Sequence, residues 1–309
     1  MAMSRVISID GGGVRGVVPV VVLQRLTQEP GLGDLLAGTH LFAGTSTGGL
    51  IALGLAADLG LPAILDLYEQ RAPTIFHTTL FHKIRDLDNL IGAAYRLGNL
   101  RGQLHEVFGE RRLADLRARV LVPAFDLDNE APNPAQRTWK PKLFHNFPGD
   151  DCDGERLAYD VGTYTAAAPT FFPTADGFVD GGVFATNPSM CAVAQTQDRR
   201  NEAGDRGDLA QLVLLSLGTG QSLQYIEGAH DWGQLQWVRP LIDLMLDGVN
   251  GIADYECRHL LRERYYRFAP TFAPGTTIGQ DAVDTIPFLI EYARRLDLSG
   301  LIEWLSAHW

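Results

Sequence analysis

A serine lies at the centre of the motif Gly44-Thr45-Ser46-Thr47-Gly48, which matches the pattern G-x-S-x-G. The motif separates two apolar segments: residues 41–43 suit a short buried strand, and residues 50–59 suit a helix. A serine on a sharp strand-to-helix turn requires small residues two positions before and after it. The sequence therefore predicts a nucleophilic Ser46, with the start of the next helix stabilising negative charge beside it. Glycine-rich turns that contain serine are also common without a catalytic role, so the motif needs support from the rest of the chain.

A second glycine cluster, Asp10-Gly11-Gly12-Gly13-Val14-Arg15-Gly16, follows the β-branched segment at residues 5–9. Gly11, Gly13 and Gly16 satisfy the G-x-G-x-x-G spacing of a dinucleotide-binding turn. Such a site also requires an acidic residue at the end of the second strand. Here that strand ends at Ala43 and enters the serine motif, so the sequence argues against a dinucleotide-dependent reductase.

The same glycine cluster is suited to holding an anionic oxygen. Consecutive glycines allow their backbone N–H groups to point at one oxygen without obstruction by side chains. We therefore expect Gly11, Gly12 and Gly13 to form an oxyanion hole, with the Arg15 guanidinium adding a positive charge near it.

A nucleophilic serine needs a base, and the sequence offers a carboxylate in place of a histidine. Asp180 ends the apolar segment 177–180 and precedes Gly181 and Gly182, so we expect it at a strand end that faces a cleft. None of the eight histidines has the sequence context of a catalytic triad: His40, His77, His82, His105, His145, His230, His259 and His308. His308 would satisfy the chain order of α/β-hydrolases, but a histidine next to the end of a chain is more often simply exposed.

Together, the three glycine-marked sites resemble the motifs of the patatin-like phospholipase family. The matching segments are residues 10–16, 44–49 and 180–182, and they follow one another in the family's order. Residues 167–173 and the pair Asn187-Pro188 also resemble the family's pattern. One such motif would be weak, whereas three in order are specific. The resemblance covers residues 5–220, and the region after Gly220 adds little to it.

The resemblance implies a catalytic dyad of Ser46 and Asp180 without a histidine. Ser46 would attack an ester carbonyl and Asp180 would accept its proton, while the glycine amides hold the oxyanion and Arg15 lies near that oxygen or near a lipid phosphate. The implied substrate is a phospholipid or lysophospholipid, and the product is a free fatty acid. Because an aspartate has an ordinary pKa of about 3.9, the cleft must raise that pKa or position the carboxylate well. No cofactor and no metal are implied, and the acidic turn at residues 150–155 does not fit a calcium loop.

The alternation of strand, glycine turn and helix predicts an α/β fold with a mainly parallel central sheet. The resemblance implies the three-layer α/β/α form of that fold, with Ser46 on the turn between a strand and a helix. Because residues 10, 46 and 180 must meet at one site, we expect a single domain over residues 1–309. Its motif core would span residues 5–220, followed by a helical extension at residues 221–309.

The chain carries 26 basic and 37 acidic residues, which gives a formal net charge of −11. This charge argues against binding a nucleic-acid polymer and against electrostatic attraction to an anionic membrane. Peripheral contact with a membrane would therefore depend on apolar groups. The first residues show neither an apolar signal core nor a small-residue cleavage site, so we expect a cytoplasmic protein that acts at the membrane surface.

Two apolar groups have alternative explanations. Phe76, Leu80, Phe81 and Ile84 are expected to pack on the core, or else to form a mobile cap over the cleft. Leu301, Trp304, Leu305 and Trp309 recur at helical spacing, and we expect them to dock onto the core in preference to anchoring in a membrane interface.

Two further functions remain open at this stage. The scaffold would also suit a non-catalytic protein that stores or binds lipid, although Ser46 and Asp180 are both present. Small bacterial members of the resembling family include effectors that cyclic nucleotides switch on in anti-phage defence, so a small nucleotide activator is a third possibility. No residue in the sequence indicates the oligomeric state.

Overall fold

The computed structural model describes residues 4–76, 93–223, 225–226, 228 and 231–309. Its centre is a sheet of seven strands in the order β4-β3-β2-β1-β6-β7, with β5 also paired to β3. The strands are β1 Ser4–Ile9, β2 Leu41–Gly44, β3 Arg119–Asp126, β4 Lys140–His145, β5 Phe178–Asp180, β6 Leu212–Leu217 and β7 Tyr265–Phe268. Neighbouring strands are parallel except for β4 and β5, which both run antiparallel to β3.

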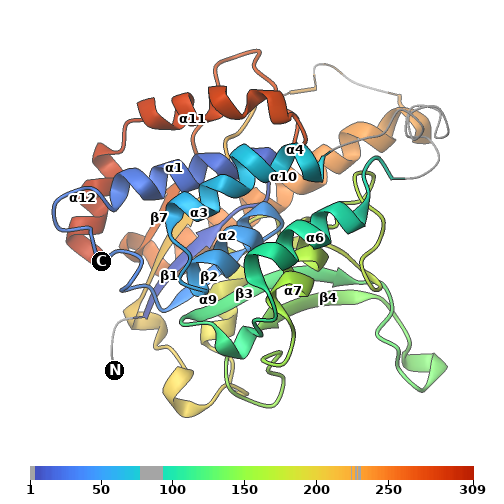
Figure 1. Cartoon of the computed structure of the whole chain (residues 1–309), viewed down its shortest axis with the longest axis horizontal. Helices are drawn as coiled ribbons and strands as arrows, with labels where there is room; N and C mark the ends of the chain where they lie inside the picture. Colours follow the sequence, from blue (N-terminus) through green and yellow to red (C-terminus); the bar gives the residue numbers. More distant parts are fainter. Residues whose placement is uncertain (1–3, 77–92, 224, 227, 229–230) are drawn as a thin grey trace.

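Helices cover both faces of this sheet (Figure 1). They are α1 Val17–Leu26, α2 Thr47–Ala56, α3 Leu61–Asp66, α4 Ala72–Ile75, α6 Leu97–Phe108, α7 Ala158–Ala166, α8 Gly182–Ala185, α9 Ser189–Thr196, α10 Gln234–Leu261, α11 Ile286–Arg295 and α12 Ser299–His308. The larger apolar core joins one face of the sheet to α1, α2, α3, α6, α7, α11 and α12. The smaller core joins the other face to α9 and α10. The predicted three-layer α/β/α fold with a mainly parallel sheet is therefore confirmed.

The central strands are continuously apolar because both of their faces are buried. Along β1, Val6 points into the smaller core, whereas Ile7 and Ile9 point into the larger one. Helix α2 is apolar on all sides for a similar reason: it packs between the sheet and α7, and nearly all of its residues are buried. This burial explains why residues 41–56 carry no charged side chain.

Three strand ends meet at the carboxyl edge of the sheet. β1 and β2 are parallel, with Ile9 opposite Gly44, so the glycine cluster and the serine motif leave the sheet side by side. β2 pairs with β3 only as far as Leu121, while β4 occupies the other side of β3. β5 therefore pairs with the part of β3 that extends beyond β2, with Asp180 opposite Ala124. This arrangement brings Asp180 next to the turn that follows β2.

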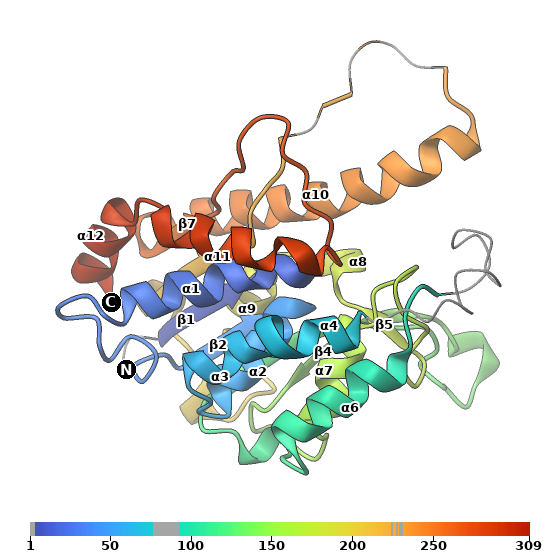
Figure 2. The same ribbon diagram turned by 45° about the horizontal axis from the view of Figure 1, so that its top comes forward.

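The C-terminal region differs from the expected helical extension, because it also contributes strand β7 to the sheet. The sequence analysis missed β7, which is only four residues long and carries a charged Arg267 among its aromatic residues. It also missed helix α9, a short segment of mostly small residues. Helices α10, α11 and α12 lie where helices were expected. Figure 2 shows α11 running beside α1, where the Arg25 guanidinium donates to the carbonyl oxygens of Ala293 and Leu296.

The C-terminal helix α12 docks onto the core, as the sequence analysis expected. Leu301 and Leu305 are fully buried, and Trp304 and Trp309 pack partly against the same core. The Trp304 indole N–H also donates to the carbonyl oxygen of Glu263, at 2.8 Å. Within the described residues, no helix is both long enough and apolar enough to cross a membrane.

Of the possible cap residues, only Phe76 lies within the described part of the chain, where it packs against the larger core. Leu80, Phe81 and Ile84 lie outside the described residues.

We predict that Leu305→Ala lowers the free energy of unfolding by about 3 kcal/mol, because it leaves a cavity in a core that α12 closes. Glu303→Ala, on the exposed side of the same helix, should change it by less than about 0.5 kcal/mol. Chemical denaturation followed by circular dichroism measures both. Equal, small effects of the two variants would mean that α12 does not depend on the core.

Candidate active site

Ser46 lies on a strained turn between β2 and α2. Its φ of 55° and ψ of −124° are unusual for a residue with a side chain, and such strain concentrates at functional sites. The turn has no room for side chains two positions before and two positions after the serine. A Cβ on Gly44 would lie 1.9 Å from the Gly48 carbonyl oxygen, and one on Gly48 would lie 2.2 Å from that of Ile9. The motif glycines are therefore required by close packing, as the pattern predicted.

Hydrogen bonds link this turn to α7, β3 and α8. The Ser46 N–H donates to the Thr165 hydroxyl of α7 at 2.9 Å, and that hydroxyl donates to the Pro123 carbonyl oxygen of β3 at 2.6 Å. The Thr45 hydroxyl donates to the Ala185 carbonyl oxygen. The sequence analysis did not identify Thr165, because a threonine within a helix carries no local signal of a long-range contact.

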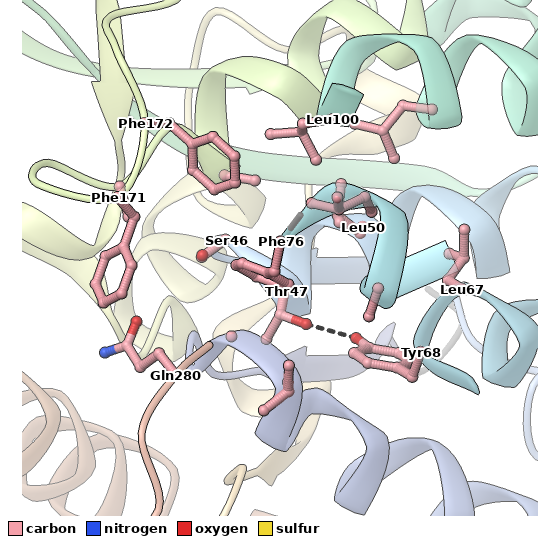
Figure 3. Close-up of a pocket in the computed structure, with 17 residues that line it drawn as sticks. Ser46, Thr47, Leu50, Leu67, Tyr68, Phe76, Leu100, Phe171, Phe172 and Gln280 are labelled. Atoms are coloured by element: carbon pink, nitrogen blue, oxygen red, sulfur yellow. Dashed lines mark hydrogen bonds between the residues drawn. The ribbon is translucent and has the colours of Figure 1, made fainter. Parts of the chain in front are cut away.

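A third support comes from a π-helical segment, Leu67–Arg71, between α3 and α4. The Tyr68 hydroxyl lies 2.5 Å from the Thr47 hydroxyl at the start of α2 (Figure 3). Burial raises the pKa of Tyr68, so it stays neutral. Gly16 gives this pair its space, since a Cβ there would lie 2.3 Å from both hydroxyl oxygens. π-Helical turns often occur at functional sites, and this one contributes residues to the cleft described below.

Asp180 is buried beside Ser46 and is held by two donors. Burial raises the pKa of Asp180 to about 6, although hydrogen bonds from the Ser46 hydroxyl and the Gly182 N–H partly oppose this effect. The Gly182 N–H lies 2.7 Å from the carboxylate oxygen Oδ1. Gly181 lets the chain turn there, because a Cβ on it would lie 2.3 Å from the Pro123 carbonyl oxygen. The pKa of this carboxylate is thus shifted towards neutral pH, and the group lies beside the serine.

No histidine of the described chain lines the cleft at Ser46. The ring of His308 lies against the Trp304 carbonyl oxygen within α12. His77 and His82 lie outside the described residues.

The glycine cluster lies against Ser46, but its three amides are not equivalent. A Cβ on Gly11 would lie 3.4 Å from the Ser46 Cβ, so the two residues are in close contact. The Gly11 N–H donates to the Thr186 carbonyl oxygen at 2.9 Å. By contrast, no carbonyl in the described part of the chain accepts the N–H of Gly12 or Gly13. Gly13 has a φ of 58° and lines the same cleft as Ser46. Of the three expected donors, the Gly11 amide is therefore already engaged.

Arg15 differs from its expected place near the oxyanion. Its guanidinium donates to the carbonyl oxygens of Gly12 and Gly220, each at 3.2 Å. These bonds turn the positive charge towards the carbonyl oxygens at the base of the glycine cluster. In this structure Arg15 braces the loop and does not line the cleft.

Residues beyond Gly218 complete the glycine loop, which the sequence analysis did not anticipate. The Thr219 hydroxyl donates to the Gly11 carbonyl oxygen at 2.9 Å. The Gln280 carbonyl oxygen accepts the Val14 N–H at 2.8 Å, and the Gln280 side chain lies at the mouth of the cleft (Figure 3). The C-terminal region therefore shapes the candidate oxyanion hole directly.

A buried ion pair joins the start of this loop to β7. The Arg267 guanidinium donates to both carboxylate oxygens of Asp10, and it also donates to the Ser216 hydroxyl at 2.8 Å. The two charged side chains are only 10% and 4% exposed. The carboxylate raises the pKa of Arg267, which therefore stays charged. Because Asp10 directly precedes Gly11, this ion pair fixes the position at which the glycine loop leaves the sheet.

An apolar cleft opens over Ser46. Its lining is almost entirely aliphatic and aromatic apart from Ser46, Thr47, the Tyr68 hydroxyl and Gln280. The remaining lining residues are Gly13, Val14, Leu50, Leu67, Ala72, Ile75, Phe76, Leu100, Leu104, Ala166, Ala168, Phe171 and Phe172. In Figure 3 the aromatic rings of Phe76, Phe171 and Phe172 lie near Ser46, and Leu50, Leu67 and Leu100 lie on the other side of Phe76. Such a cleft suits an unbranched hydrocarbon chain.

The acidic turn at residues 150–155 is engaged in ion pairs. Asp153 lies 2.7 Å from the Lys142 ammonium, and Asp151 lies 2.8 Å from the Arg200 guanidinium. Among the described residues, no group of three His, Cys, Asp or Glu side chains is placed to hold a metal ion.

The fold and the site together define an α/β/α protein with a serine on a strand-to-helix turn and a buried carboxylate beside it. A family model described as "Patatin-like phospholipase" matches residues 7–193, and the chain belongs to this family. The family membership supports lipid hydrolase activity.

Individual relatives extend the similarity beyond the motif core. The chain is 28% identical to the CotR protein of Bacillus subtilis, covering 100% of this chain and 99% of that protein. It is 30% identical to "Patatin-like protein 1" of Oryza sativa subsp. indica, covering 80% of this chain and 68% of the relative. It is 29% identical to a "cGAMP-activated phospholipase" of Pseudomonas aeruginosa, covering 91% of this chain and 82% of the relative.

We predict that Asp180→Asn changes how stability depends on pH. The folded-state pKa of about 6 lies above the unfolded value of 3.8, so the folded wild type binds more protons between these values. Its free energy of unfolding should therefore fall as the pH rises through this window, by on the order of 3 kcal/mol. The variant should lack this fall, whereas Asp34→Asn, at an exposed site, should retain it. Urea titrations at several pH values measure the difference, and parallel curves for wild type and Asp180→Asn would contradict the raised pKa.

Removing Arg267 should be far more costly than removing a surface arginine. We expect Arg267→Met to lower the free energy of unfolding by about 3–5 kcal/mol, because it leaves the Asp10 carboxylate buried without a partner. Arg295→Met, which breaks an exposed pair with Glu291, should cost less than about 1 kcal/mol. Adding Asp10→Asn to Arg267→Met should recover part of the loss. Equal costs for the two arginines, measured by denaturation, would show that the buried pair does not hold the loop.

Proposed function

We propose that the protein is a lipid acyl hydrolase that cleaves fatty acyl esters with Ser46 as nucleophile and Asp180 as base. One observation supports this most strongly: a buried carboxylate with a pKa of about 6 accepts a hydrogen bond from a serine hydroxyl that opens into an apolar cleft. The substrate class is a phospholipid or lysophospholipid, and the product is a free fatty acid. The proposed reaction needs no cofactor.

In the first step, the Ser46 oxygen attacks the ester carbonyl carbon and its proton passes to Asp180. The carbonyl oxygen becomes an oxyanion, which the N–H groups of Gly12 and Gly13 stabilise. The carbon–oxygen bond to the alcohol then breaks, and the alcohol leaves with the proton from Asp180. The acyl group remains on Ser46. A water molecule next attacks the acyl-enzyme, gives its proton to Asp180 and releases the fatty acid, while the proton returns to Ser46.

The raised pKa makes Asp180 a better base than an ordinary carboxylate. A group with a pKa of about 6 is still mostly charged at neutral pH, yet it accepts protons more readily than one with the ordinary value of 3.8. It remains a weaker base than would suit an amide leaving group. The arrangement is therefore matched to esters.

The cleft determines which part of the substrate lies where. The leucine side chains and the aromatic rings would receive the acyl chain, with the ester at Ser46 and the rest of the lipid towards Gln280 and the mouth. Since such lipids reside in bilayers, the enzyme would act at a membrane surface, in the cytoplasm.

A second candidate is a phospholipase effector that a small nucleotide switches on. The observation that favours it is the 29% identity to a "cGAMP-activated phospholipase" over most of this chain. Both candidates use the same dyad and differ only in their need for an activator. A non-catalytic lipid-binding role is less well supported, because Ser46 and Asp180 are both present and the Ser46 hydroxyl influences the pKa of Asp180.

We predict that wild-type protein releases fatty acid from phospholipid vesicles and that Ser46→Ala lowers the rate at least about 10³-fold. Asp180→Asn should lower it by about 10²- to 10⁴-fold, since it removes the base. Ser306→Ala and Asp34→Asn, both at exposed sites, are the matched controls. The wild-type kcat/KM should fall about tenfold per pH unit below about pH 6, because protonated Asp180 cannot accept the serine proton.

Full activity of Ser46→Ala would remove the nucleophile from the proposal. Activity that appears only when a cyclic dinucleotide such as cGAMP is added, and that still requires Ser46, would select the activated effector.

A further inference from the structure

Trp139 is unusual among the tryptophans of this chain because it is exposed. Its side chain is 69% exposed, whereas the other four tryptophans are at least partly buried. Trp139 lies on the long hairpin between β3 and β4, residues 127–139, and Leu127 lies beside it at 40% exposure. Keeping a large indole in water is unfavourable, and an amphipathic ring of this kind is suited to the boundary between water and hydrocarbon.

A positive charge lies beside Trp139, on a hairpin that also carries the acidic side chains of Asp128 and Glu130. The chain has only three lysines, and two of them, Lys140 and Lys142, follow this tryptophan closely. Lys142 is paired with Asp153, while Lys140 is exposed next to Trp139. A protein of net charge −11 thus places a cation beside its most exposed tryptophan. A lysine beside an interfacial aromatic ring can reach the phosphates of lipid headgroups.

Polar contacts hold the hairpin in one shape. The Arg137 guanidinium is paired with the Asp128 carboxylate. The backbone N–H of Asn129 donates to the Thr138 carbonyl oxygen, and the Asn129 side-chain oxygen accepts the Thr138 N–H, each at 3.0 Å. Because the hairpin is already ordered, inserting Trp139 into a surface would require little further loss of conformational entropy.

The hairpin leaves the sheet at the edge where the candidate site lies. Ala124 of β3 is opposite Asp180, and Asp126 is opposite Lys140. Trp139 therefore lies about 10 Å beyond Asp180 along the strand direction, at roughly 3.3 Å per residue. Figures 1 and 2 both show the light-green hairpin projecting from the body of the protein. Leu127 and Trp139 lie at the base of this hairpin, next to the last paired residues of β3 and β4, so a surface that touched them would face the carboxyl edge on which the cleft opens.

We propose that this hairpin docks the protein on a phospholipid bilayer, with Trp139 and Leu127 entering the interface and Lys140 contacting lipid phosphates. This proposal rests on the proposed function, because docking would serve to bring Ser46 to its ester substrate. The docking itself does not require catalysis. It gives an acidic protein a local means of binding a surface that its net charge does not favour.

The test is co-sedimentation of the full chain with vesicles of phosphatidylcholine and phosphatidylglycerol, in the Ser46→Ala background so that the lipid stays intact. Trp139→Ala should lower vesicle partitioning about tenfold. Tyr255→Ala is the matched control: it removes an aromatic ring of 58% exposure from α10 and should change partitioning less than about twofold. Lys140→Glu should lower partitioning about fivefold at low salt, with a smaller effect at high salt.

Unchanged partitioning of Trp139→Ala, an equal loss in Tyr255→Ala, or no vesicle binding by the parent protein would each overturn the proposal. Thermal unfolding of each variant identifies a loss that comes from misfolding, and Lys140→Glu tests the same surface independently. Vesicle binding that depends on Trp139 without any fatty-acid release by the wild type would support docking and count against the proposed function alone.

Discussion

The burial of the Asp180 carboxylate beside the Ser46 hydroxyl is the constraint on which the rest of the candidate site depends. Burial disfavours the charged carboxylate and raises its pKa to about 6, while the Gly182 N–H and the serine hydroxyl keep the charge tolerable. Further donors would lower the pKa of this carboxylate and make it a weaker base for the proposed reaction, whereas fewer donors would raise its pKa. The position of Asp180 depends on β5, which pairs with the part of β3 that extends beyond β2.

A second buried charge sets the position of the glycine loop. Asp10 and Arg267 are both removed from water and bonded to each other, so neither can be lost without leaving the other unpaired. The pair joins the first strand to the last strand of the sheet, and Thr219 and Gln280 add bonds from the same region. The family model matches residues 7–193, yet the loop that would hold an oxyanion depends on residues well beyond that range.

The apolar cleft and the acidic surface place opposite demands on a protein that acts on lipids. The cleft favours a hydrocarbon chain, whereas a net charge of −11 opposes approach to an anionic bilayer. An ordered hairpin with one exposed tryptophan and a neighbouring lysine would meet both demands without changing the overall charge. Weak, local docking of this kind would also leave the protein free to dissociate between substrates.

The sequence by itself determined the family, the fold class and the residues whose size is fixed by close packing within a turn. Gly44, Ser46 and Gly48 could be recognised because a tight turn dictates residue size locally. The tertiary structure alone decided how these residues are supported. Arg267, Gln280 and Thr165 act through contacts between segments distant in the chain, and such contacts leave no local pattern. The roles of Gly11 and Arg15 depended likewise on which carbonyl oxygens the fold brings near them, and that is a property of packing.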